Sequence, residues 1–119
     1  MTDEAIDVID LERVRSLKDD IGDADFFREL LGMFVTTSAA ALKELDEAVQ
    51  RGDAEATRLA SHSLKGCASN IGANGLAELW EAIERAGAAG QLEDLAKQVA
   101  QGAAGLARVQ VRMEEIAAS

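Results

Sequence analysis

Apolar residues recur along the chain at the three- and four-residue spacing of amphipathic helices, and glycines interrupt the pattern at intervals. The longest apolar stripe falls within residues 24–50 and consists of Phe26, Phe27, Leu30, Leu31, Phe34, Val35, Leu42, Leu45 and Val49. Glycines at positions 22, 52, 72, 75 and 90 separate one periodic segment from the next. The pattern therefore predicts an all-α chain without a β-sheet.

The predicted helices are one short helix over about residues 11–20 and four long helices. The long helices cover about residues 24–50, 54–71, 75–89 and 92–117. Asp23 and Asp53 directly precede two of the long helices, and aspartate is a favoured N-cap residue. Because short connections make consecutive helices antiparallel, we expect an up-down-up-down four-helix bundle with a short extra N-terminal helix.

The two ends of the chain carry weaker patterns. Residues 1–9 mix acidic and apolar types, and we expect them to fray or to pack loosely. Gly102 and Gly105 interrupt the last predicted helix, where they indicate either a bend or close packing against another helix. The whole chain, residues 1–119, is expected to form a single domain with its core at about residues 10–117.

Composition and charge narrow the classes of function. The 119 residues include no proline and only 3% aromatic residues, which favours long helices with an aliphatic core. The net charge of −10 argues against binding to nucleic acid or to an anionic membrane surface. Cys67 is the single cysteine, and neither a signal peptide nor a membrane span is recognisable. We therefore expect a cytoplasmic, monomeric protein without an intramolecular disulfide.

The third predicted helix has two different faces. At 100° per residue, the side expected to face the core carries Ala56, Ala60, Leu64, Cys67 and Ile71. The other side carries Arg58, His62, Lys65, Gly66 and Ser69. His62 is the only histidine in the chain. The pattern predicts that its ring is exposed to solvent and that Cys67 is a small buried residue.

The face around His62 has a specific chemistry. Lys65 follows His62 by three residues, so its ammonium can reach a group attached to the imidazole. Gly66 occupies the next turn, although a glycine inside a helix costs about 1 kcal/mol relative to alanine. A need for open space beside the imidazole ring would explain why a glycine occupies position 66. In a strongly acidic chain, Arg58, His62 and Lys65 form the one patch expected to accept an anion.

The sequence around His62 resembles the motif of the histidine phosphotransfer domain family. The motif reads His-x-Leu-Lys-Gly, then four variable residues, an apolar residue, a glycine and a downstream leucine. The matching stretch here runs from His62 through Lys65, Gly66 and Ile71 to Gly72, with Leu76 beyond it. Leu79 and Glu84 fit the apolar and acidic positions of the following helix, and the resemblance covers about residues 10–110.

The resemblance implies a role for each residue of the motif. His62 would accept a phosphoryl group from a receiver-domain aspartate and pass it to another, between a hybrid sensor histidine kinase and a response regulator. Lys65 would be the charge partner and Gly66 the steric gap, with Arg58 and Ser69 in support. The chain also lacks a nucleotide-binding motif, so we expect it to be a phosphoryl carrier rather than an enzyme. The receiver would supply the aspartate and Mg²⁺, and no metal or cofactor is expected on this chain.

Two alternatives remain beside this interpretation. A di-iron site in a helical bundle uses Glu-x-x-His pairs, whereas this chain has one histidine and no glutamate three residues before it. A module that docks on a receiver without being phosphorylated is the stronger alternative. Loss of His62 or Gly66 would have favoured that module, but both are present.

Overall fold

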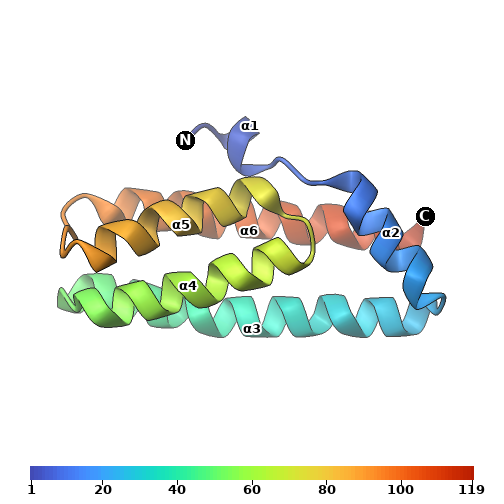
Figure 1. The fold of residues 1–119 in the computed structure, drawn as a ribbon, viewed down its shortest axis with the longest axis horizontal. Coiled ribbons are helices and arrows are strands. Elements are labelled where there is room, and N and C mark those ends of the chain that lie inside the picture. Colours follow the sequence, from blue (N-terminus) through green and yellow to red (C-terminus); the bar gives the residue numbers. More distant parts are fainter.

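The structure, a computed structural model, describes residues 1–119 and contains helices but no strand. The helices are α1 (Asp3–Ile6), α2 (Leu11–Ile21), α3 (Ala24–Arg51), α4 (Ala54–Asn70), α5 (Asn74–Ala88) and α6 (Leu95–Ala118) (Figure 1). The four long helices α3–α6 lie side by side in an elongated bundle of 44 × 24 × 18 Å. The predicted antiparallel four-helix architecture is confirmed.

The helix boundaries follow the predicted capping residues. The Asp23 carboxylate accepts hydrogen bonds from two backbone N–H groups of α3, and Asp53 accepts one from Ala56 N–H at 3.0 Å. Gly52 ends α3 with a left-handed φ of 70°, a conformation that strains residues with a side chain. The helix α6 begins at Leu95, later than predicted, because Asp94 adopts a left-handed φ of 65° just before it.

Large side chains from several helices fill the interior of the bundle. The largest fully buried side chains include Trp80, Phe27, Leu45, Leu64, Leu76, Leu79 and Ile83. The Trp80 ring packs directly on Gly102 of α6, where a Cβ atom would overlap the ring. Gly105 similarly faces the Ile6 side chain. Both glycines therefore mark close packing, which decides between the two alternatives that the sequence left open.

The N-terminal residues do not fray, so that prediction is wrong. Ile6 is completely buried, and the Asp7 carboxylate accepts a hydrogen bond from Arg108 Nε at 2.8 Å. Gly75 N–H donates to the Val8 carbonyl at 3.0 Å, and the missing Cβ of Gly75 leaves room for the carbonyls of α1. A few apolar residues among acidic neighbours, without a clear periodicity, were too weak a signal to predict this docking.

None of the helices has a stretch that is both long and apolar enough to span a bilayer.

Candidate functional site

The helix α4 lies between α3 and α5, and its buried face differs from the predicted one. The buried residues in and after α4 are Thr57, Ala60, Ser61, Leu64, Ala68 and Ile71. Ala56 and Cys67, which were expected in the core, are only half-buried. Burial of two hydroxyls is possible because each bonds within the helix: Thr57 Oγ1 donates to Asp53 O at 2.8 Å, and Ser61 Oγ donates to Thr57 O.

Close packing brings α4 and α5 together along the edge that carries His62. A Cβ atom on Gly87 of α5 would approach the Arg58 backbone nitrogen to 3.0 Å, so only glycine allows this separation without displacement. The side chains that line the outer edge of the α4–α5 pair can consequently reach across it. This proximity brings a carboxylate of α5 to the imidazole of α4.

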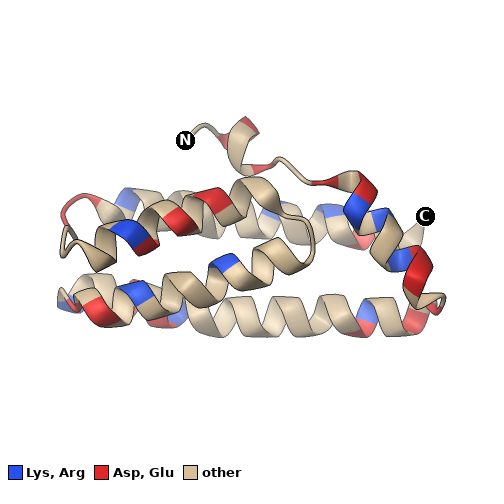
Figure 2. Cartoon of the chain, viewed as in Figure 1, with Lys and Arg blue, Asp and Glu red and all other residues tan.

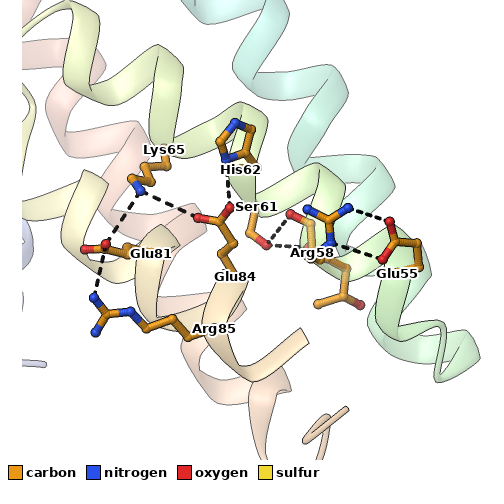
Figure 3. A network of polar contacts seen from close by, with 9 residues as sticks. Glu55, Arg58, Ser61, His62, Lys65, Glu81, Glu84 and Arg85 are labelled. Carbon is orange, nitrogen blue, oxygen red and sulfur yellow. Dashed lines mark hydrogen bonds and ion pairs between the residues drawn. The ribbon is translucent and has the colours of Figure 1, made fainter. Parts of the chain in front are cut away.

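The imidazole of His62 is exposed at the middle of α4, as predicted. Its side chain is 67% exposed, and Nδ1 lies 2.7 Å from Glu84 Oε2 of α5 (Figure 3). An ionised carboxylate can only accept, so Nδ1 carries the hydrogen in this contact. The other ring nitrogen, Nε2, lies on the side of the ring away from Glu84 and in this tautomer holds a free lone pair.

An ion-pair chain continues from His62 along α5. Lys65 Nζ lies 3.7 Å from Glu84 Oε1 and 3.5 Å from Glu81 Oε1. Arg85 Nη2 lies 3.3 Å from the same Oε1 of Glu81. Figure 3 shows the resulting row of alternating charges, in which the Glu84 carboxylate contacts both His62 and Lys65. The site is therefore a network of side chains from α4 and α5 rather than one face of α4 alone.

Gly66 borders open space. A Cβ atom built on it would meet nothing within 4 Å, and the residue is exposed. Nothing within the chain therefore requires glycine at this position. The space beside His62 agrees with the expected gap, and any steric conflict with a larger residue would have to come from a second molecule.

The two supporting residues lie apart from this network. Arg58 is paired with Glu55 one turn earlier in α4, with Arg58 Nε 3.0 Å from Glu55 Oε2. The hydrogen bonds from Arg58 hold the pKa of Glu55 below its usual value, and Glu55 raises the pKa of Arg58 in turn. Ser69 is exposed and its side chain makes no hydrogen bond. The structure thus groups His62 with Lys65 and does not bring Arg58 or Ser69 to them.

The predicted basic patch of Arg58, His62 and Lys65 consequently has no surplus of positive charge in the structure. Both cations expected to accept an anion already contact carboxylates of this chain. The periodicity of α4 alone predicts no contact between His62 and Glu84. A usable signal was present on α5, where Glu81, Glu84 and Arg85 share one helix face by their spacing.

The central segments of α3 and α4 are poor in charge. The segment 30–42 of α3 has no charged residue, and Lys65 is the only one in the segment 59–70 of α4. Figure 2 shows this uncharged central stretch. Exposed apolar side chains occur on both helices. Met33 of α3 is 67% exposed. Leu59 of α4, which borders Glu44 and Glu47 of α3, is 52% exposed. In a protein of net charge −10, this surface is suited to contact with another protein.

Comparisons with known proteins agree with this site. A family model described as Hpt domain matches residues 29–118. A similar solved structure is the crystal structure of histidine-containing phosphotransfer protein B (HptB) from Pseudomonas aeruginosa PAO1. It shares 31% sequence identity and a TM-score of 0.84 with this chain, over 92% of this chain and 93% of that one. A search of curated proteins found no match.

Proposed function

The chain belongs to the Hpt domain family, whose members transfer phosphoryl groups on histidine in phosphorelays, and we propose that His62 is the residue that carries the phosphoryl group here. The observation that carries this assignment is the exposed imidazole whose Nδ1 bonds to Glu84. His62 is also the only histidine in the chain. The protein as a whole would then act as a carrier of the phosphoryl group.

The geometry of His62 suits a direct transfer. Donation from Nδ1–H to Glu84 leaves the Nε2 lone pair free to attack the phosphorus of a receiver's aspartyl phosphate. The N–P bond forms as the P–O bond to the aspartate breaks, and that electron pair leaves with the carboxylate. The proton stays on Nδ1, where the Glu84 carboxylate balances the positive charge of the phosphorylated ring. The reverse sequence passes the group to a second receiver.

Lys65 and Gly66 have distinct roles in this proposal. The Lys65 ammonium would turn from its carboxylates toward the phosphoryl oxygens and stabilise their charge. Gly66 would leave room for the phosphoryl group and for the receiver loop that delivers it. Phosphoryl transfer needs mainly alignment and charge stabilisation, so the receiver would contribute the aspartate and Mg²⁺ while this chain contributes the nucleophile.

The partners proposed are response-regulator receiver domains and a hybrid sensor histidine kinase. A receiver's phosphorylation pocket is acidic because it holds the aspartate and binds Mg²⁺. Approach to a protein of net charge −10 would be repulsive over most of its surface. The segment 59–70 of α4, in which Lys65 is the only charged residue, would reduce that repulsion where the two sites must meet. We therefore propose that the docking surface lies on the exposed sides of α3 and α4 around His62, Leu59 and Gly66.

Incubation with a phosphorylated receiver and Mg²⁺ tests the proposed function. We expect phosphate on the protein that is labile in acid and stable in base, as a phosphohistidine is. His62→Gln serves as the control and should take up none. Binding of the receiver without phosphate uptake would instead support the docking module that is never phosphorylated.

Hydrogen exchange of the complex tests the docking surface. Amides in the exposed parts of α3 and α4 around His62 should be protected when an unphosphorylated receiver is added, with α6 as an internal reference. Protection confined to α6 would contradict the proposed surface.

A further inference from the structure

On the premise of the proposed function, we propose that Glu81 and Arg85 are positioning residues that control how readily Lys65 leaves its resting partners for the phosphoryl group on His62. The inference concerns the far end of the ion-pair chain, beyond the residues of the sequence motif. Neither residue contacts His62.

The resting position of Lys65 is shared between two carboxylates of α5. Its Nζ lies 3.5 Å from Glu81 Oε1 and 3.7 Å from Glu84 Oε1. Glu81 Oε1 also lies 3.3 Å from Arg85 Nη2, so two cations compete for one oxygen atom (Figure 3). Arg85 is 78% exposed and Glu81 is 37% exposed. Substitution of either residue should therefore leave the core of the bundle intact.

Phosphorylation changes the balance of this competition. A phosphoryl group adds a charge of roughly −1.5 to −2 and three strong acceptor oxygens beside Lys65. Glu84 remains occupied, because it holds Nδ1–H of the charged ring. Glu81 is the partner that Lys65 can leave, and Arg85 stays behind to neutralise it. Lys65 moves as an intact ammonium, so this rearrangement transfers no proton and breaks no covalent bond.

The two residues should consequently have opposite effects. Glu81→Gln removes a competitor for Lys65 and should shift the phosphotransfer equilibrium toward phosphorylated His62. Arg85→Gln removes the competitor for Glu81, so Glu81 holds Lys65 more firmly and the equilibrium should shift toward the phosphorylated receiver. Exposed ion pairs are worth little, so each shift should be about twofold to fivefold at most.

The experiment measures the equilibrium constant for phosphoryl exchange between a phosphorylated receiver domain and the protein, with the phosphorylated fractions read by ³¹P NMR. Each substitution is measured alone in the otherwise unaltered protein and again in combination with Lys65→Met. Glu78→Gln is the matched control for Glu81→Gln, because Glu78 is an exposed carboxylate of the same helix that forms no ion pair, and both substitutions change the net charge by the same amount. Thermal unfolding of each variant checks the fold.

Opposite shifts for the two variants that both disappear with Lys65→Met support the inference. If the shifts persist in the Lys65→Met background, or if Glu78→Gln shifts the equilibrium as much as Glu81→Gln does, the effect comes from net charge in general. Either result would overturn the inference. Unchanged equilibria with normal phosphorylation of His62 would overturn the role of Glu81 and Arg85 while leaving the proposed function intact. Absence of phosphate on His62 in the unaltered protein would overturn both.

Discussion

Gly66 and Gly102 occupy interior positions of two long helices, yet their surroundings are opposite. Gly66 of α4 has nothing near its absent side chain, whereas Gly102 of α6 lies directly under the Trp80 ring. The first glycine preserves empty space at the surface beside His62, and the second allows a large side chain to fill the core. The edge around His62 thus leaves the room that the proposed docking of a receiver requires, while the α5–α6 interface is filled by the chain's own packing.

His62→Gln should have the largest effect on transfer and almost none on stability, because the side chain is 67% exposed. Phosphate uptake from a phosphorylated receiver should disappear completely, as the nucleophilic nitrogen is gone. Unfolding in urea should have the same midpoint as the unaltered protein. A strongly lowered midpoint would mean that the contact between His62 and Glu84 stabilises the fold. The surface around His62 would then resemble the packed region at Gly102 in its contribution to stability.

Lys65→Ala should slow transfer without abolishing it, since the ammonium stabilises charge but forms no bond to phosphorus. Loss of one preorganised charge contact typically slows a reaction by about a hundredfold. The half-buried lysine is partly screened by solvent, so a smaller loss is expected here. Rapid-quench transfer assays at saturating receiver would measure it. Complete loss of phosphorylation would assign Lys65 a larger role than charge stabilisation.

Gly102→Ala tests the packed region. Its new methyl group would overlap the Trp80 ring, and overpacking of this kind typically costs about 1–3 kcal/mol of unfolding free energy. Chemical denaturation measures that loss. Transfer per folded molecule should stay normal, because His62 belongs to α4 and is exposed, whereas Gly102 packs on the buried Trp80 at the α5–α6 contact. Reduced transfer by the fully folded variant would show that the two regions are coupled.

Gly66→Ala should change stability only slightly, and in the direction opposite to Gly102→Ala. Alanine is the better helix former by about 1 kcal/mol, and the structure has room for its methyl group, so the unfolding free energy should stay equal or rise slightly. Transfer should nevertheless become slower, because the methyl group enters space needed by the receiver. A normal transfer rate would disprove the steric-gap explanation of Gly66.

The parts of the fold that sequence predicted best depend on local chemistry. Asp23 and Asp53 cap helices through groups two or three residues away, so their role is visible in the chain itself. The exposed position of His62 followed in the same way from helical periodicity. The predictions that failed concerned contacts between residues that are distant in the sequence. Glu84 is 22 residues from His62, and its contact required the separation of α4 and α5 to be known.

The buried face of α4 failed for a different reason. Thr57 and Ser61 were not among the residues expected on the core side, yet both are buried and both hydroxyls bond to carbonyls one turn earlier. Periodicity arguments that count only apolar residues overlook such self-satisfied side chains. Cys67 was placed inside for the converse reason, although it is only half-buried.

The docking of the first ten residues has a consequence for how the chain folds. The bond between Asp7 and Arg108 joins residues 101 apart in sequence, whereas α3–α6 are joined by short connections. Loops that span most of a chain close slowly relative to local helix pairing. During synthesis, moreover, Asp7 emerges long before its partner exists. The first ten residues should therefore reach their native place only after the four long helices have packed together.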